Sequence, residues 1–263
     1  MFSDKALERI VREALGKPDG VLTTDDLLTV EVIAPTYCAG VCDLSELQYC
    51  KNLKRLALWD DYIRPLGNLR KIDVLAHLPR LREISLVNYR FISDLSPLAK
   101  LIDLEVLDLA GNAIEEISVL SGLTSLRVLR VGVNPIADLS PINYLTELTE
   151  LDIPKLAHNL NFSAFTKLQS LNIAFSDSDD LKYITDAKQL SKLHICANSV
   201  DVSCLSHLKH LKELSIAARA ITGLDSLSQL KKLEVLRIWH SGGKIDEHML
   251  PSSLRELFVG ILI

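Results

Sequence analysis

Aliphatic residues recur along the chain in one short pattern, Leu-x-x-Leu-x-Leu, in which Val or Ile also fills the later positions. From Leu81 onward, successive copies begin about 22 residues apart. A constant period of about 20 to 29 residues indicates repeated units that stack on one another. The pattern begins at Leu27, Leu53, Leu81, Leu104, Leu126, Leu148, Leu168, Leu190, Leu211, Leu233 and Leu254.

Each copy of the pattern predicts a short strand. In residues 126–134, "LRVLRVGVN", Leu129 and Val131 share one face, and Arg130 lies on the other. One short strand cannot bury its apolar face alone, so we expect it to stack beside the next copy in a parallel sheet. Between strands, apolar residues such as Leu139 and Ile142 follow a spacing of three, which predicts a short 3₁₀ or α turn.

A polar position follows each strand. Asn112, Asn134 and Asn198 occupy it, and an asparagine amide there can bond the backbone of the turn that leaves the sheet. In the other repeats we expect irregular turns, because the position is held by Asp61, Tyr89, Leu156, Ser176, Arg219 and Ser241.

The first 26 residues predict a helical cap. Their apolar residues follow a helical spacing, with Ser3 able to begin the helix and Gly16 to end it. Thr24 begins a second short helix. We therefore expect a cap over residues 1–26 and one continuous repeat domain of about 11 units over residues 27–263. The apolar helical face comprises Leu7, Ile10, Val11, Ala14 and Leu15.

The last residues, 257–263, read "LFVGILI" and carry no polar cap. An uncovered apolar edge strand favours pairing with another strand. Three explanations stay open: a longer chain, a homodimer through this edge, or a terminal turn folded over it.

The repeats that carry "DLSPL" at 94–98 and "DLSPI" at 138–142 resemble those of bacterial internalin-like leucine-rich repeat proteins, and residues 2–27 are similar to the N-terminal cap of that family. The resemblance implies an α/β fold, a right-handed leucine-rich-repeat solenoid (horseshoe). Its parallel sheet would line the concave face, and short 3₁₀ or α turns the convex face. It implies protein binding without naming a partner. The last unit, 250–259, resembles the Leu-Pro repeats of secreted bacterial effectors.

The concave face is the predicted binding surface, because solenoids bind partners with strand side chains that point away from the core. Both tryptophans fall in outward positions of the pattern, and tryptophan near arginine is typical of binding hot spots. The alternative is that each tryptophan packs on its neighbour and binds nothing. The first repeat places Glu31 and Ile33 in these outward positions. The candidate residues are Trp59, Tyr62, Asp108, Arg130, Asp152, Phe175, His194, Arg237, Trp239, His240 and Phe258.

Charge and composition narrow the classes of partner. The net charge is −5, and acidic and basic residues are mixed along the chain, so nucleic acid is an unfavoured partner. No apolar run approaches the roughly 18 residues of a membrane span. The five cysteines match no disulfide framework and indicate free thiols. The N-terminus carries no signal-peptide pattern, so we expect a cytoplasmic protein, or a secreted or surface protein if a leader was removed.

Motifs of nucleotide-binding, hydrolase, kinase and metalloprotease sites are missing from the sequence, so we predict no catalysis, no cofactor and no bound metal. The alternative is a metal-binding enzyme that uses Cys204, His207 and His210. For the cysteines at 38, 42 and 50 we favour buried free thiols. For the aspartates at 60–61 and 177–180 we favour solvated turns.

One repeat is longer than the others. Residues 64–71, "RPLGNLRK", lengthen this repeat by about six residues and carry three basic side chains. Two interpretations stay open: a functional loop, or a tolerated insertion. The sequence as a whole predicts a non-catalytic protein–protein interaction module. The alternatives are a cell-surface adhesin, a secreted effector fragment whose anchor or enzymatic domain is absent, and a cytosolic adaptor or inhibitor.

Overall fold

The computed structural model describes residues 2–37, 40–176, 178–241, 245–246, 248 and 250–261, without the side chains of residues 175–180. The chain divides into two compact units, Met1–Leu145 and Thr146–Ile263, and each is described by itself. No described helix is both long enough and apolar enough to span a bilayer.

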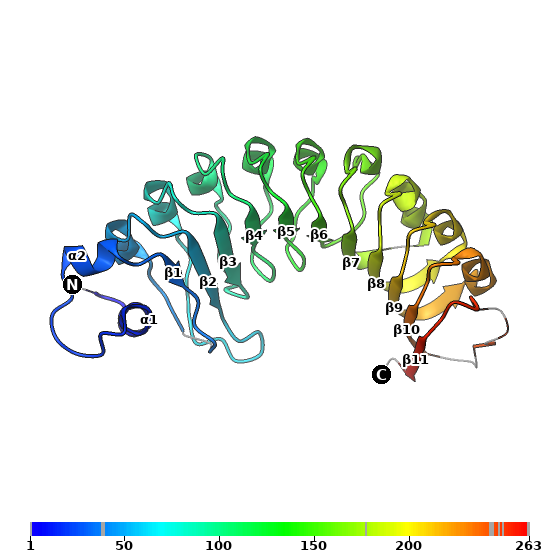
Figure 1. The fold of residues 1–263 in the computed structure, drawn as a ribbon, viewed down its shortest axis with the longest axis horizontal. Helices are drawn as coiled ribbons and strands as arrows, with labels where there is room; N and C mark the ends of the chain where they lie inside the picture. The colour runs from blue at the N-terminus through cyan, green and yellow to red at the C-terminus, as the bar shows by residue number, and fades with distance from the viewer. Residues whose placement is uncertain are drawn as a thin grey trace. The chain divides into compact units, whose positions relative to one another are not determined.

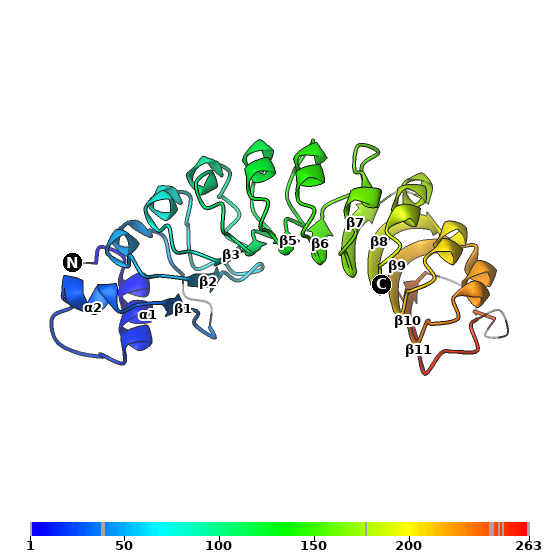
Figure 2. The same ribbon diagram turned by 45° about the horizontal axis from the view of Figure 1, so that its top comes forward.

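The first unit stacks its strands in parallel and in sequence order, with a 3₁₀ helix after each strand (Figures 1 and 2). Its strands line one side of the layer and its 3₁₀ helices the other. The strands are β1 (Val32–Ile33), β2 (Arg55–Trp59), β3 (Glu83–Val87), β4 (Val106–Asp108) and β5 (Val128–Arg130). The 3₁₀ helices are η1 (Ser45–Tyr49), η2 (Asp73–His77), η3 (Ser96–Leu98), η4 (Ser118–Gly122) and η5 (Ser140–Tyr144).

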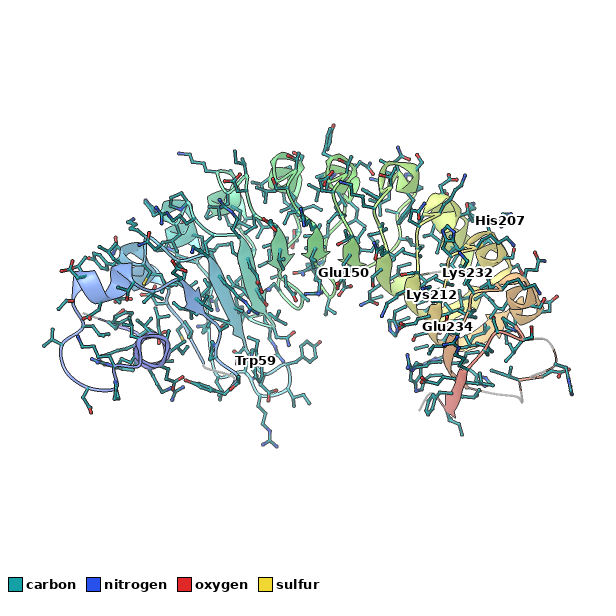
Figure 3. All side chains as sticks on the ribbon, viewed as in Figure 1. Trp59, Glu150, His207, Lys212, Lys232 and Glu234 are labelled. Atoms are coloured by element: carbon teal, nitrogen blue, oxygen red, sulfur yellow. The ribbon has the colours of Figure 1, made fainter. Side chains whose placement is uncertain are left out.

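The second unit repeats this arrangement with longer strands. His207, at the end of its helix η8, points away on the helical side (Figure 3). The strands are β6 (Glu150–Ile153), β7 (Ser170–Ser176), β8 (Lys192–Asp201), β9 (Glu213–Thr222), β10 (Val235–His240) and β11 (Glu256–Ile261). The 3₁₀ helices are η6 (Phe162–Ala164), η7 (Ser178–Asp186), η8 (Ser203–His207) and η9 (Leu224–Gln229).

The leucines of the repeat pattern form the core, as predicted, and nearly all of them are fully buried. Within each unit, carbonyls at the strand starts accept two N–H groups from the next repeat. The carbonyl of Lys54 accepts from Arg82 and Glu83 at 2.8 and 3.1 Å, and that of Lys212 accepts from Glu234 and Val235 at 2.8 and 3.0 Å. This ladder satisfies backbone groups that the strands themselves leave unpaired.

The first repeat is shifted from its predicted register. Ile33 lies opposite Leu56 and is fully buried, so its predicted outward position is wrong. Glu31 lies one residue before the strand, where its carbonyl accepts the N–H groups of Lys54 and Arg55. The physical reason is that Leu27 is already buried in the N-terminal cap, so the pattern of this repeat begins at Val30.

Two helices precede the first strand. Helix α1 (Lys5–Leu15) begins at Asp4, whose carboxylate accepts the N–H of Leu7, and it ends at Gly16 in the left-handed conformation that glycine adopts without strain. The predicted cap, Ser3, instead donates its hydroxyl and its N–H to the carboxylate of Glu46. The sequence placed the helix correctly but assigned its cap one residue too early.

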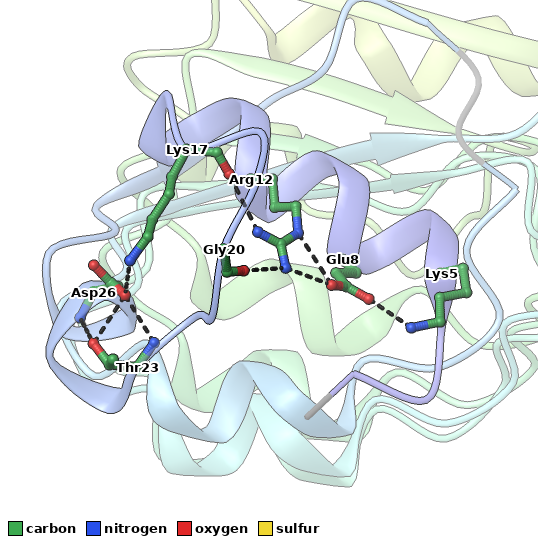
Figure 4. A network of polar contacts seen from close by, with 7 residues as sticks. All are labelled: Lys5, Glu8, Arg12, Lys17, Gly20, Thr23 and Asp26. Atoms are coloured by element: carbon green, nitrogen blue, oxygen red, sulfur yellow. Dashed lines mark hydrogen bonds and ion pairs between the residues drawn. The ribbon is translucent and has the colours of Figure 1, made fainter.

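A network of ion pairs and hydrogen bonds joins the C-terminal end of α1 to helix α2 (Thr24–Leu28), as Figure 4 shows. Arg12 binds Glu8 at 2.8 Å and donates to the carbonyl of Gly20. Lys17 reaches Asp26 at 2.7 Å, and the N–H and hydroxyl of Thr23 donate to the same carboxylate. Together these contacts, with that of Lys17 the strongest, lower the pKa of Asp26 to about 2.

The asparagine position works as predicted in the first unit. Asn134 is buried; its amide donates to the carbonyls of Leu109, Val131 and Gly132, and its oxygen accepts the N–H of Ile114. The amide of Asn112 likewise bridges two carbonyls, those of Leu86 and Leu109. Each asparagine side chain therefore supplies hydrogen bonds to backbone carbonyls that have no partner in the sheet once the strand has ended.

In the second unit this prediction is wrong. Asn198 is exposed in the extended strand β8, and Arg219, where an irregular turn was expected, is exposed in β9. The strands continue because Ala197 and Ala218 are small enough to be buried opposite each other as a further inward rung.

The two asparagines provide a matched test. We expect Asn134→Ala to lower the free energy of unfolding by about 2–3 kcal/mol, because it leaves several buried backbone groups without partners. We expect Asn198→Ala to change it by less than about 0.5 kcal/mol, because its side chain is exposed. Urea unfolding of both variants measures the difference, and equal losses would contradict the assigned roles.

The repeated "DLSP" motif begins 3₁₀ helices. Asp94 accepts the N–H and hydroxyl of Ser96 at 2.8 and 3.0 Å, and Asp138 does the same with Ser140. The backbone and side-chain hydrogen bonds of Ser96 hold the pKa of Asp94 below its usual value. Those of Ser203, its hydroxyl first, lower the pKa of Asp201.

These shifts predict sensitivity to acid. A carboxylate whose pKa is lowered in the folded state stabilises the fold above its unfolded pKa, near 4, and loses that contribution as the pH falls through the folded value. We expect the urea midpoint to fall between pH 6 and pH 3. Asp94→Asn keeps an acceptor but removes the charge, so its deficit relative to wild type should shrink at pH 3. A deficit that does not change with pH would exclude the ionised form as the stabilising species.

Candidate protein-binding surfaces

The first unit leaves the outward face of its strands uncovered by any described element, and we call this its open face. Asp108 and Arg130 lie opposite each other on β4 and β5 and form an ion pair of 3.3 Å. The two charges therefore largely neutralise each other. Trp59, at the end of β2, is 40% exposed and points away from the helical side (Figure 3).

The open face of the second unit carries a row of polar side chains across neighbouring strands. Asp152 lies beside Asn172, which lies beside His194 on the next strand. Desolvation lowers the pKa of His194, so its ring is neutral at pH 7. Arg237 forms a 2.7 Å ion pair with Glu256 of the neighbouring strand.

Trp239 and Phe258 form an aromatic platform on β10 and β11. Their ring centroids are 5.4 Å apart at an interplanar angle of 48°. The indole lies against Gly260, where a Cβ atom would approach its Cδ1 to 2.7 Å, so glycine is required for this packing. Trp239 thus packs on its neighbours, as the alternative held, while Phe258 stays 47% exposed.

The predicted binding residues divide between the two units. In the first unit, Trp59 and Tyr62 lie near the end of β2, apart in sequence from the paired Asp108 and Arg130. In the second unit, Arg237, Trp239, His240 and Phe258 lie on β10 and β11, with His240 half-buried. The side chain of Phe175 lies outside the described residues.

The loop that joins β2 to η2 is organised by Asp60, which was predicted to lie in a solvated turn and is fully buried. Its two carboxylate oxygens accept the N–H groups of Asp61, Leu66 and Gly67 at 2.8–2.9 Å. A Cβ at Gly67 would lie 2.6 Å from the carbonyl oxygen of Val41. We call residues 60–71 the Asp60 loop.

The Asp60 loop holds apolar side chains in solvent. Tyr62, Ile63 and Leu66 are 56%, 82% and 67% exposed. The guanidinium of Arg90 lies 5.1 Å from the ring centroid of Tyr62, and that of Arg70 lies 4.1 Å from Phe91. Of this group, sequence reasoning identified Tyr62 and the basic insertion. It missed the exposed Ile63 and Leu66, because apolar residues in a loop do not reveal whether they face the core.

Asp60 and Asp61 offer a matched pair for testing the loop. Both oxygens of Asp60 accept N–H groups, so Asp60→Asn turns an NH₂ group toward a donor and should accelerate hydrogen exchange at residues 61–67. In Asp61, one oxygen accepts the N–H groups of Ile63 and Arg64. Asp61→Asn retains that acceptor and should leave exchange unchanged. Mass spectrometry measures both, and equal protection in the two variants would show that Asp60 does not organise the loop.

A polar hollow of about 740 Å³ lies at the strand starts of the second unit. Lys212 and Lys232 line it (Figure 3), and Lys192 in its wall is paired with Glu213 at 2.8 Å. Lysines predominate among the charged residues that line it, and Glu213 is also present.

The cysteines and histidines considered for metal binding do not converge. His207 contacts the carbonyl of Cys204 through Nδ1 at 3.0 Å, and no group of three or more metal-binding side chains occurs among the described residues. Burial raises the pKa of the Cys204 thiol and raises that of Cys50 to about 11, so both are protonated at neutral pH. Asp177 and Cys38 lie outside the described residues.

The last strand has an uncovered edge. On β11, Val259 and Ile261 are 45% and 80% exposed, and Leu257 is half-buried. Pairing of this edge with a second copy stays a prediction, and Leu262 and Ile263 lie outside the described residues.

Stacked parallel strands, buried leucines and short 3₁₀ helices define a leucine-rich-repeat fold, and the chain is similar to bacterial internalins. A family model described as "Leucine Rich repeats (2 copies)" matches residues 102–144. Internalin C2 of Listeria monocytogenes is similar to this chain at 25% identity and a TM-score of 0.63, covering 90% of this chain and 94% of its own. The functional domain of InlJ from the same organism has 17% identity and a TM-score of 0.60, covering 98% and 69%.

Two further relatives show how widely the fold occurs. The leucine-rich-repeat ectodomain of the Arabidopsis receptor kinase HAESA, solved with a peptide hormone ligand, shares 20% identity and a TM-score of 0.55, covering 90% of this chain and 39% of its own. Human leucine-rich repeat-containing protein 56 is 52% identical over 48 residues. That match spans 18% of this chain and 9% of the human protein.

Proposed function

We propose that this chain is a non-catalytic protein-binding module that holds a protein or peptide partner on the open face of its sheet. Leucine-rich repeat proteins are commonly interaction modules, and the HAESA ectodomain was solved with a peptide bound. The proposal rests on the aromatic platform of Trp239 and Phe258, whose rings lie 5.4 Å apart on an uncovered sheet face.

The platform has the features of a binding hot spot. Aromatic and arginine side chains dominate the binding energy of interfaces when a partner excludes water from them. Here the indole is already held against Gly260, so little side-chain entropy is lost when a partner covers it. Arg237, on the same strand, is oriented by its ion pair with Glu256 and adds a directed donor beside the rings.

The surface next to the platform carries short side chains, so a partner can approach the strands closely. Ala217 lies opposite Trp239 on β9, and Cys196 lies opposite Ala217 on β8. Because these side chains are short, the backbone or side chain of a partner can lie along the strands and contact the indole from the side. Strands spaced about 4.8 Å apart then offer a regular series of contacts to an extended segment.

The test replaces the platform. A partner is captured on the wild-type protein and on a Trp239→Ala/Phe258→Ala variant, and its affinity is measured by calorimetry. We expect the double variant to bind at least about tenfold more weakly, which is the range of hot-spot residues.

Tyr144→Ala is the matched control, because this tyrosine is 65% exposed but lies on η5, on the helical side of its unit. Its affinity should equal that of wild type. A partner retained equally by all three proteins would remove the open face of β10 and β11 as the binding site.

A further inference from the structure

We infer that the Asp60 loop is a second docking site, which takes a segment of a partner protein that combines apolar side chains with carboxylates. The inference rests on the proposed function in treating the chain as a protein-binding module. The proposed docking site consists of different residues, in the first unit, so it is tested with variants other than those that test the open-face site on β10 and β11.

The loop is built to hold its apolar side chains outward. Burying a carboxylate is costly unless its oxygens are hydrogen-bonded, and Asp60 meets this requirement with three backbone N–H groups. One of these comes from Gly67, where no larger residue fits beside Val41. This arrangement orders a long loop, yet the result is that Ile63 and Leu66 face water rather than the core.

The exposed apolar side chains lie near one another, because the contacts of Arg90 with Tyr62 and of Arg70 with Phe91 bring residues 90–91 beside the Asp60 loop. Trp59 and Phe91, each 40% exposed, add to the side chains of the Asp60 loop at the ends of β2 and β3. Single exposed apolar residues are ordinary, but a patch rimmed by polar groups marks an interaction site. The rings of Tyr62 and Phe91 are each covered on one side by a guanidinium, which holds them in place.

The rim of the patch is positively charged. Arg64, Arg70, Lys71 and Arg90 form no ion pair within the described part of the chain, although the neighbouring strands pair their charges, as in Arg55 with Glu83 at 2.9 Å. Asp61, an acid of the same loop, already accepts two N–H groups of the loop. Carboxylates of a partner supply the missing complement.

Backbone strain occurs at the same place. Asn88 and Arg90 both have φ of 64°, a left-handed conformation that is uncommon for residues other than glycine and asparagine. Strain of this kind persists where the surrounding structure imposes it, often at functional sites. In Arg90 the conformation accompanies the placement of its guanidinium over Tyr62.

A protein segment is favoured over an anionic membrane. The net charge of −5 repels an anionic bilayer, and Asp61 lies within the loop that would have to enter the headgroup region. A protein segment can instead place its carboxylates beside the basic residues of the rim without surrounding Asp61 with negative charge.

The experiment selects ligands without assuming a partner. A displayed library of random 12-residue peptides is selected on the wild-type protein and counter-selected on an Ile63→Ser/Leu66→Ser variant. We expect the enriched peptides to contain both apolar residues and Asp or Glu. A synthetic copy of one enriched peptide should bind the variant at least tenfold more weakly, and Arg64→Gln/Arg90→Gln should weaken binding and reduce its dependence on salt.

Three controls separate the outcomes. Ile102→Ser removes a similarly exposed side chain of the same unit and should bind the peptide like wild type. The Trp239→Ala/Phe258→Ala variant should also bind it normally, so failure of this inference is distinguishable from failure of the open-face site. Vesicles of phosphatidylserine and phosphatidylcholine should not bind.

Several results would overturn the inference. One is a selection in which no peptide distinguishes the wild type from the loop variant. A second is enrichment of apolar peptides without acidic residues. A third is vesicle binding that Ile63→Ser/Leu66→Ser abolishes, which would assign the loop to a membrane. An unchanged unfolding midpoint confirms that each variant is folded.

Discussion

Every repeat of this protein depends on its neighbours, because a single short strand with one apolar face cannot bury that face alone. The inward leucines therefore stack from one repeat to the next, and within each unit carbonyls at the strand starts accept two N–H groups of the following repeat. Neither the leucine core nor this backbone ladder uses the side chains on the outward face of the strands. The proposed binding site on β10 and β11 lies on that face.

The residue that follows each strand decides where the strand ends. In the first unit, buried Asn112 and Asn134 bond the carbonyls of adjacent turns, so the chain leaves the sheet there. In the second unit, Ala197 and Ala218 are buried instead and the strands extend to ten residues. One repeat period thus accommodates two strand lengths, which give the two units different open faces.

The two proposed sites use different physical means to present aromatic and apolar groups. On β10 and β11, the lack of a Cβ at Gly260 leaves room for the indole of Trp239 to pack beside the ring of Phe258. In the Asp60 loop, a buried carboxylate gathers backbone N–H groups and thereby orders Ile63 and Leu66 in solvent. In both cases the group that creates the surface is itself inaccessible to a partner.

The sequence by itself determined the period, the core leucines, the parallel strands and the 3₁₀ turns, because these follow from local patterns that repeat many times. It also identified Trp239 and Phe258 as outward residues. Only the tertiary structure decided the register of the first repeat, the burial of Asp60 and the exposure of Asn198. Each of these depends on contacts between residues far apart in the chain: the burial of Leu27 in the cap, the closure of the loop at Gly67, and the rung formed by Ala197 and Ala218. A residue type that bonds the backbone in one repeat is exposed in another, because its neighbours determine whether the strand has already ended.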